Sequence, residues 1–381
     1  YEELRVAKGG YYPDVNLRIA SGREQSQTTS IENEGDYRRV LTRSEQTVTL
    51  RQMLFDGFEV ASRVKRQEAI YKSTAFNTND NMRALSLRVA ESYLEVLRVR
   101  EQVELAQSNV DAHQEILDNV NKRLKKGLAR KADAIQVKGR LSLAKAQLRR
   151  QQASIKAIEE RYKEAVGRLP EKNLTAPNNL TAKLPKTLAE AKGIVLAEHP
   201  ALHSNKSSIN ALAAGIKEAK AKYYPKFNLE LTGNENDNLS GARGLSEHYS
   251  AMVTMDMNLF RGGQDRAAIA SQRYQKAQKM EEKLELELSL VRDLSVAWYA
   301  RDGKLVELEY FIQHMISSDK TLKAYETQYD MGQRTLFDLL NARSEFFRSK
   351  ATVVDTKYAN LLSSYQLMAN MGTLLQELEI K

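Results

Sequence analysis

The sequence contains no cysteine, which excludes disulfide bonds and thiolate metal sites. It also contains no run of about 18 apolar residues, the length that marks a membrane-crossing helix. Only six prolines are present, and none of them lies within residues 14–169 or 226–381. Because a proline inside a helix costs about 3 kcal/mol or more, these two stretches can form long uninterrupted helices.

Signals of a catalytic or cofactor site are also missing. There is no glycine-rich loop of the kind that holds nucleotide phosphates, and no nucleophile, base and orienting group that could form a catalytic set. His199 and His203 have the helical spacing of paired metal ligands, but Pro200 marks a helix start between them and no third ligand follows nearby. We therefore expect that the protein is not an enzyme and has no cofactor or metal site.

Charges of both signs are abundant, with 58 basic and 49 acidic residues and a net charge of +9. Such mixed charge is typical of long solvated helix faces. The densest basic run surrounds Gly127 and consists of Lys122, Arg123, Lys125, Lys126, Arg130 and Lys131. Residues 122–131 include no aromatic residue, although single-stranded nucleic acids are usually held by aromatic side chains between basic ones. We therefore do not expect a nucleic acid partner.

The two halves of the chain repeat each other. Most matching positions lie 205 residues apart, and they include Val48 and Val253, Leu54 and Leu259, Gly57 and Gly262, Gly127 and Gly332, Asp133 and Asp338, and Gly167 and Gly372. The motif Tyr-Tyr-Pro-x-x-Asn-Leu occurs at residues 11–17 and again at 223–229. An internal repeat of this kind predicts one body built from two similar halves. Tyr1 corresponds to position 213, within an expected helix, which predicts that the natural chain begins further upstream.

Two long helices are expected in each half. Between positions 82 and 124, steps of three and four residues reach thirteen positions, and eleven of them are apolar. This is the seam of a coiled coil. Apolar positions resume after Gly127, and the matching helices of the second half cover 262–330 and 334–372. The sequence therefore predicts a helical hairpin in each half, with its tip at Gly127 or Gly332.

Shorter segments outside the helices alternate between apolar and polar residues. These segments are residues 15–19, 48–54, 227–231 and 253–260. Strands of about 10 residues with one apolar face are typical of transmembrane β-strands. A half-buried soluble sheet gives the same pattern over one strand. Four such strands beside very long helices favour a sheet that spans a membrane. The polar segments Ser21–Gln46 and Gly233–His248 are expected to be exposed hairpin loops.

Aromatic residues lie at the strand ends that each hairpin brings together. They are Tyr12, Phe55, Tyr224 and Phe260. Because tyrosine and phenylalanine at one level suit the border between lipid and water, we expect these four to contact membrane lipid.

The expected elements follow the two repeats. The first repeat, 1–185, has strands at about 11–20 and 46–56, a helical hairpin at about 57–169 and a linker at 170–185. The second repeat, 186–381, has a helix at 186–222, strands at about 224–233 and 249–260, and a helical hairpin at about 262–376.

Several motifs stand out in this order. They are Tyr12-Pro13 and Tyr224-Pro225, Leu54-Phe55-x-Gly57 and Leu259-Phe260-x-Gly262, His199-Pro200-x-Leu202, and Gly332-Gln333-Arg334-Thr335-Leu336-x-Asp338-Leu339-Leu340-Asn341-Ala342. Together they resemble the TolC-like outer-membrane export ducts over essentially the whole chain. The resemblance implies a mixed α/β membrane protein and a homotrimer. Four strands from each chain would form a twelve-stranded β-barrel, continuous with a long α-helical coiled-coil barrel in the periplasm. Only a closed barrel leaves no strand edge unpaired in lipid.

The resemblance also implies a gate. Asp133, Tyr329 and Arg334 match the family's network of salt bridges and hydrogen bonds, and Asp338 and Asn341 match the acidic ring of its aperture. The family usually has a second aspartate where this chain has Asn341, so this ring would carry half the usual charge. The simpler interpretation is that Arg334 and Asp338 form a surface ion pair on one helix, worth about 0.3–0.5 kcal/mol.

The hairpin tips match the positions at which the family meets a periplasmic adaptor protein. These positions are Gly127, Leu128, Ala129 and Arg130 in the first repeat and Gly332, Gln333 and Thr335 in the second. The simpler interpretation of the basic run is a solvated helical turn.

The resemblance implies a channel of the bacterial outer membrane that extends into the periplasm. It would passively export cargo delivered by an inner-membrane ABC transporter, or a proton-driven pump, through the adaptor. Residues 127–133 and 332–342 are similar to the branch for type I secretion of proteins such as a large surface adhesin. A multidrug or metal efflux duct is the alternative within the family. A soluble coiled-coil scaffold is the alternative outside it, and such a scaffold would fold without detergent.

Overall fold

The computed structural model describes residues 1–33, 35, 38–177 and 184–380. The chain divides into two compact units. Tyr1–Asn77 and His203–Glu285 form the first, which we call the strand unit. Thr78–Leu202 and Leu286–Lys381 form the second, which we call the helix unit. Each unit contains segments of both repeats, so neither unit coincides with a repeat.

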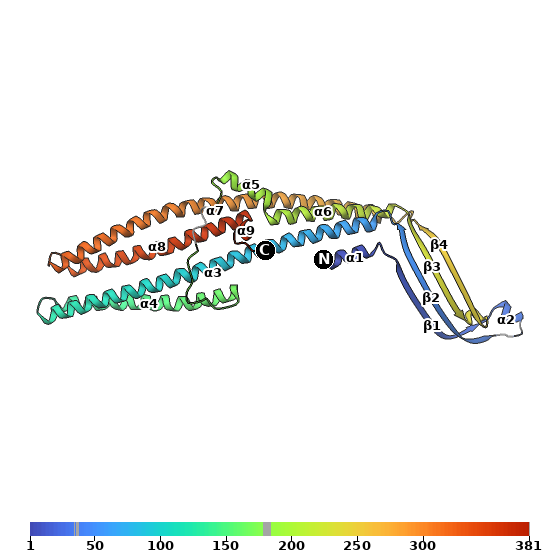
Figure 1. Ribbon diagram of the computed structural model, residues 1–381, viewed down its shortest axis with the longest axis horizontal. Helices are drawn as coiled ribbons and strands as arrows, with labels where there is room; N and C mark the ends of the chain where they lie inside the picture. Colours follow the sequence, from blue (N-terminus) through green and yellow to red (C-terminus); the bar gives the residue numbers. More distant parts are fainter. Residues whose placement is uncertain (34, 36–37, 178–183, 381) are drawn as a thin grey trace. The chain divides into compact units, whose positions relative to one another are not determined.

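The strand unit contains one antiparallel sheet in the order β1-β2-β3-β4 (Figure 1). Its strands are β1 Asp14–Ser26, β2 Arg39–Phe55, β3 Lys226–Asp237 and β4 Leu245–Asp256. All four extend further towards the hairpin loops than the apolar alternation predicted. Polar pairing supports the extension, since Arg43 of β2 donates to Glu24 of β1 at 2.8 Å. The loops themselves contain the short helices α2 Thr29–Asn33 and η3 Leu239–Gly241.

The strand register gives the sheet one apolar face. Leu17 pairs with Val48, and Val48 pairs with Gly233. Because paired residues share a face and neighbours alternate, one face carries Val15, Leu17, Ile19, Val48, Leu50, Leu229, Leu231, Val253 and Met255. Many of these side chains are exposed, for example Leu17 at 65% and Val253 at 64%. The other face is mainly polar and carries Asn16, Arg18, Thr49, Arg51, Asn228, Glu230, Thr232 and Thr254.

The long helices form the two predicted hairpins (Figure 1). Their bounds are α3 Glu59–Lys125, α4 Lys131–Val166, α7 Gln264–Asp330 and α8 Leu336–Met371. The two turns contain Gly127 with φ +74° and Gly332 with φ +75°, a backbone conformation that glycine adopts readily. Within the part of the chain that the structure describes, no helix has an apolar stretch long enough to cross a membrane.

The helix expected at 186–222 is interrupted. It consists of α5 Leu188–Glu198, α6 Pro200–Lys220 and the 3-10 helix η2 Ala221–Tyr223. His199, between α5 and α6, has an extended backbone with φ −63° and ψ 124°. The cause is Pro200, because a proline disfavours the helical conformation of the residue before it. The remaining helices are α1 Glu2–Gly9 and α9 Leu374–Glu377. Residues 178–183 of the expected linker lie outside the described part of the chain.

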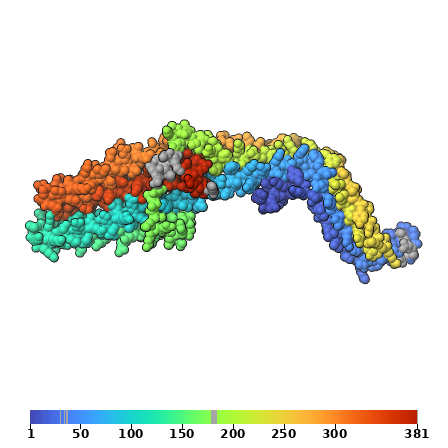
Figure 2. Space-filling view, viewed as in Figure 1, coloured from blue at the N-terminus to red at the C-terminus, as the bar shows by residue number. Residues whose placement is uncertain are grey.

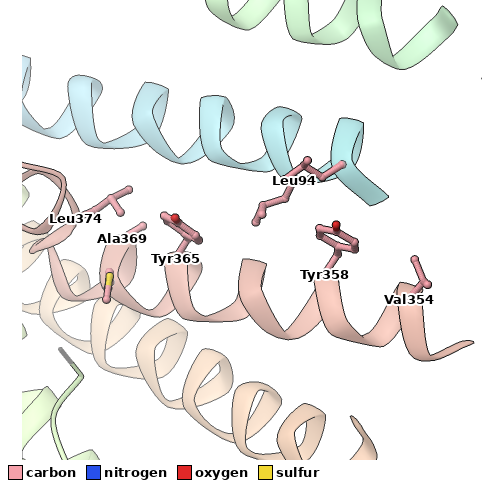
Figure 3. Packing of buried hydrophobic residues seen from close by; sticks show 8 residues of the cluster. Leu94, Val354, Tyr358, Tyr365, Ala369 and Leu374 are labelled. Atoms are coloured by element: carbon pink, nitrogen blue, oxygen red, sulfur yellow. The ribbon is translucent and has the colours of Figure 1, made fainter. Parts of the chain in front are cut away.

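One cluster of the helix unit's core lies between its hairpins. Tyr358 and Tyr365 of α8 lie on the side of that helix that faces Leu94 of α3, and Leu374 of α9 belongs to the same cluster (Figure 3). The α3–α4 and α7–α8 hairpins lie side by side in the space-filling view (Figure 2). Burying one such leucine contributes about 1.5–3 kcal/mol, so packing of this cluster stabilises the unit. The predicted seam is buried in other clusters, where Val99 packs with Ile158 and Val110 packs with Leu141.

Helices α4 and α8 end at glycines that occupy matching positions of the two repeats. Gly167 has φ +85° and Gly372 has φ +81°. A Cβ atom on Gly372 would lie 2.9 Å from Cδ of Pro200 and 3.2 Å from Cα of His199. A Cβ atom on Gly167 would meet no described atom within 4 Å. The two sites therefore share a backbone conformation but differ in their surroundings.

We expect Gly372→Ala to lower the midpoint of thermal unfolding more than Gly167→Ala. Both substitutions force alanine into the left-handed region, at about 1–2 kcal/mol. Only Gly372→Ala adds a clash with Pro200, and a clash of this kind lowers stability by a further amount of about 1–3 kcal/mol. Circular dichroism of the purified variants measures both midpoints. Equal shifts would contradict close packing of Gly372 against the start of α6.

Candidate functional site

The turns at the two hairpin tips have the same backbone hydrogen bonds. After α3, the N–H of Leu128 donates to the carbonyl of Arg123 at 2.8 Å. After α7, the N–H of Gln333 donates to the carbonyl of Gln328 at 2.8 Å. Each bond ends a long helix around a glycine with positive φ. The duplicated sequence therefore builds two tips with one backbone geometry.

The residues predicted to dock an adaptor are mostly exposed at these tips. The exposed ones are Gly127, Leu128, Arg130, Gly332, Gln333 and Thr335. Ala129 is partly buried, because it packs against the apolar cluster that contains Val120 and Leu336. The first tip carries an excess of exposed cations, whereas the second does not. The two tips thus offer similar shapes with different charge.

Asp133 and Asp338 help to start the helices that leave the tips. The carboxylate of Asp133 accepts a hydrogen bond from the N–H of Arg130 at 3.0 Å. The N–H of Asp338 donates to the Thr335 hydroxyl at 3.2 Å, and this hydroxyl donates to the Asp338 carboxylate at 2.8 Å. Capping bonds of this kind contribute about 1 kcal/mol each. Both predicted gate carboxylates therefore also have a local structural role.

Arg334 directs its side chain towards its own repeat. Its Nε donates to Oε1 of Gln328 at 2.8 Å, and its Cζ lies 4.3 Å from the centroid of the Tyr325 ring. In the described part of the chain, Arg334 forms no ion pair with Asp133 or with Asp338. A single chain therefore does not bring the predicted network of Asp133 and Arg334 together.

Arg123 of α3 links the two hairpins at their tips. Its Nη2 lies 3.0 Å from Oδ1 of Asp330, the last residue of α7. Its Cζ lies 4.8 Å from the centroid of the Tyr329 ring. Burial raises the pKa of the Tyr329 hydroxyl, and the positive charge of Arg123 opposes that rise. Charge attraction and cation–π attraction therefore act on the same guanidinium.

Sequence reasoning missed the role of Arg123. It lies in a run of six cations, which hides any single member that has a specific partner. One signal was present, because Arg123 lies three residues after Val120, a buried seam residue, and so lies on the same face of α3. Its partner Asp330 belongs to the other repeat and lies so far away in the sequence that no local pattern predicts the contact.

Further from the tips, polar contacts join α4 and α8. Nη2 of Arg140 donates to Oδ1 of Asn341 at 3.1 Å, so the predicted aperture residue Asn341 is held by α4. Arg343 of α8 forms an ion pair with Glu326 of α7. Beside them, His113 of α3 is only 3% exposed. Burial lowers the pKa of His113 to about 4, with smaller contributions from the charges of Arg343 and Arg140.

The four predicted interface aromatics lie at one end of the sheet, because β1 and β3 begin where β2 and β4 end. Tyr12, Tyr224 and Phe260 are exposed, at 74%, 51% and 84% respectively. Phe55 is partly buried, and its ring centroid lies 6.4 Å from that of Phe227. Three of the four side chains are therefore available for contact with lipid.

The two histidines with metal-like spacing have other contacts. Nδ1 of His199 accepts a hydrogen bond from the N–H of Ala201 at 3.2 Å. The ring of His203 stacks on Phe76, with centroids 5.1 Å apart. Among the described residues, no group of three or more histidine, cysteine, aspartate or glutamate side chains could hold a metal ion.

Comparison with known proteins gives a consistent result. The family model described as "Outer membrane efflux protein" matches residues 2–168 and 193–373. The chain is 25% identical to the Outer membrane efflux protein BepC of Brucella suis, over 97% of this chain and 79% of BepC. It is 24% identical to the Alkaline protease secretion protein AprF of Pseudomonas aeruginosa, over 97% of this chain and 78% of AprF. A solved structure of CusC matches with a TM-score of 0.82 at 16% identity, over 97% of this chain and 86% of that chain.

We expect His113 to make stability depend on pH in the acid range. Its pKa is about 4 in the folded chain, whereas the ordinary pKa of a histidine is 6.5. The neutral ring therefore favours folding above pH 6.5, and this contribution is lost as the pH falls towards 4. The loss amounts to about 2–3 kcal/mol. Thermal unfolding measured from pH 7.5 to 4 should show a flatter profile for His113→Gln than for the wild type.

The matched control is His248→Gln, because His248 is an exposed residue of β4. This variant should keep the wild-type profile. If His113→Gln also keeps it, His113 is not a buried neutral group in the folded protein.

Proposed function

The chain belongs to the outer membrane efflux protein family, and we propose that it acts as a homotrimeric channel that passively exports cargo. It is an outer-membrane protein that extends into the periplasm, and it is not an enzyme. An inner-membrane transporter, either an ABC transporter or a proton-driven pump, would supply the energy. A periplasmic adaptor would connect that transporter to the hairpin tips.

The observation that carries this proposal is the sheet with an exposed apolar face and two edge strands. The edges are β1 and β4. In lipid, each unpaired backbone N–H or C=O group costs several kcal/mol, so an open edge is not stable there. β1 of one chain can pair with β4 of the next, and three chains would close a twelve-stranded barrel. The apolar face would then contact lipid, with Tyr12, Tyr224 and Phe260 at its border.

The polar face of the sheet would line the passage. Nε of Arg51 donates to Oε1 of Glu230 at 2.7 Å on this face, which keeps both charges paired beside water. The strands thus have the outward apolar and inward polar alternation of a water-filled barrel.

We propose that the tips close the channel at rest. Within one chain, Arg123 with Tyr329 and Asp330 fixes the α3–α4 hairpin to the α7–α8 hairpin. An exposed ion pair adds about 0.2–1 kcal/mol, and a cation–π contact adds about 0.5–1 kcal/mol. These polar contacts are weak compared with the apolar core of the helix unit, so the binding of a partner could break them.

Contacts between chains would complete the gate. Asp133 and Arg334 do not meet within one chain, and in a trimer they could pair with residues of the neighbouring chains. Asp338 would line the aperture together with Asn341. Because Asn341 is neutral and held by Arg140, the ring would carry one carboxylate from each chain.

For the cargo, we propose type I secretion of a protein, such as a large surface adhesin. The tip segments 127–133 and 332–342 are similar to that branch, and the relative AprF is named an alkaline protease secretion protein. Multidrug or metal efflux is the alternative, because BepC is named an efflux protein and CusC a protein of a cation efflux system.

We expect the detergent-purified protein to form a small, stable conductance in a planar lipid bilayer. Arg123→Gln should raise this conductance several-fold, because it removes both the ion pair and the cation–π contact. Arg334→Ser should raise it as well, through contacts between chains. The midpoint of thermal unfolding should change little, since the lost contacts contribute about 1–2 kcal/mol at most.

Lys138→Gln serves as the control, because it removes an exposed charge of α4 outside these contacts. Its conductance should equal that of the wild type. An unchanged conductance in Arg123→Gln would exclude the link within one chain, and an unchanged conductance in Arg334→Ser would exclude the contact between chains. Absence of any channel, from protein that stays monodisperse without detergent, would favour the soluble scaffold.

Deletion of the gene in its own host tests the cargo class. Type I secretion predicts that a large protein disappears from the medium or the cell surface, while susceptibility to drugs and metal ions stays unchanged. Mass spectrometry of the medium and growth inhibition assays measure the two effects. Increased drug or metal susceptibility with normal secretion would support the efflux alternative instead.

A further inference from the structure

A cavity of about 250 Å³ lies among α3, α4 and α8 in the helix unit. Its polar lining residues are Asn109, His113, Arg140, Gln147, Ser344 and Arg348. Because one water occupies about 30 Å³ in the liquid, the cavity has room for a small ion together with several waters. Its lining includes none of the predicted gate or docking residues.

The charge of this lining is positive. It includes two arginines and a histidine, and no aspartate or glutamate among its described members. Arg140 donates to the neutral amide oxygen of Asn341 at 3.1 Å and forms no ion pair within the described chain. Nη2 of Arg348 lies 3.4 Å from Glu345, and both side chains are about half exposed or more. Among the residues that the structure describes, no carboxylate therefore neutralises the charge of Arg140.

His113 provides an independent second observation. Its side chain is buried, at 3% exposure, and its Nδ1 has no hydrogen-bond partner in the described structure. A buried polar atom without a partner costs about 1–3 kcal/mol. Of the charged groups near this ring, Arg140 lies on α4 and Arg343 and Arg348 lie on α8. Arg343 is paired with Glu326 of α7, so the unneutralised positive charge next to the histidine comes from Arg140.

We propose that this cavity binds a small oxyanion, held by Arg140, Arg348 and the protonated ring of His113. A guanidinium group offers two parallel N–H donors to an oxyanion, and bonds to a charged donor are about twice as strong as neutral ones. An imidazolium ring donates from both nitrogens, so binding would also satisfy the buried Nδ1 atom. Asn109 and Gln147 supply neutral donors for the remaining oxygen atoms.

Binding of the anion is coupled to the uptake of a proton. A bound negative charge favours the charged form of His113, so its pKa rises when the anion binds. By linkage, the affinity for the anion must rise as the pH falls. Between pH 7.5 and pH 5.5, we expect the affinity to increase about tenfold.

Sulfate is a suitable probe, because it keeps two negative charges throughout this pH range. Equilibrium dialysis of the detergent-purified protein against radiolabelled sulfate, at constant ionic strength, measures the dissociation constant at both pH values. The expected result is one site per chain with about tenfold tighter binding at pH 5.5. Sulfate that fails to bind to the wild type at either pH would overturn the proposal.

Three variants locate the site. Arg140→Gln should lose sulfate binding, and His113→Gln should retain weak binding without dependence on pH. Arg149→Gln is the matched control, because Arg149 is an exposed cation of α4 that does not line the cavity. It should bind sulfate like the wild type. Equal binding by Arg140→Gln, or an unchanged pH dependence in His113→Gln, would place the anion elsewhere.

Circular dichroism and the elution volume of each variant show whether it folds like the wild type. If Arg140→Gln does not fold, the pH dependence of His113→Gln still decides the proposal. The sulfate measurement does not depend on the gate or the cargo, so it can fail while the channel conducts as expected.

Discussion

The requirement that every backbone N–H and C=O group has a partner organises this molecule. Inside the four long helices and between neighbouring strands, the backbone satisfies the requirement by itself. Backbone groups still need partners from elsewhere at the edge strands β1 and β4 and at the first turns of α4 and α8. Neighbouring chains would complete the edges, whereas Asp133 and Thr335 complete the helix starts. Assembly in the membrane and the structure of the tips therefore follow from the same constraint.

Different forces act in different parts of the helix unit. The middle depends on buried apolar side chains such as Leu94, Tyr358 and Tyr365, whose burial contributes several kcal/mol in total. At the tips, half-exposed polar contacts around Arg123, each worth about 1 kcal/mol or less, add to the apolar cluster that contains Val120 and Leu336. The share of exposed polar contacts is therefore larger at the tips than in the middle of the unit.

Local patterns predicted most of the fold. The apolar seam and the glycines at 127 and 332 predicted both hairpins, and period-2 alternation predicted the faces of the sheet, because each pattern reflects a repeat within one element. The expected strands ended too early on the side of the hairpin loops, since cross-strand pairs such as Arg43 with Glu24 add no apolar signal. Contacts between the repeats were largely missed. The contact of Arg123 with Asp330, and that of Arg140 with Asn341, join residues about 200 positions apart, and no local periodicity reports such pairs.

The capping role of Asp133 and Asp338 limits how the tips can evolve. At the third position of a helix, a side chain that accepts a hydrogen bond stabilises the first turn, and Asp133 does so by accepting from the N–H of Arg130. Asp338 occupies the same helix position in the second repeat, and its carboxylate accepts from the Thr335 hydroxyl instead. Arg123 and Arg334 cap no helix, so they are under no such restriction. An exchange of either arginine therefore changes the contacts at the tips and leaves the starts of α4 and α8 intact.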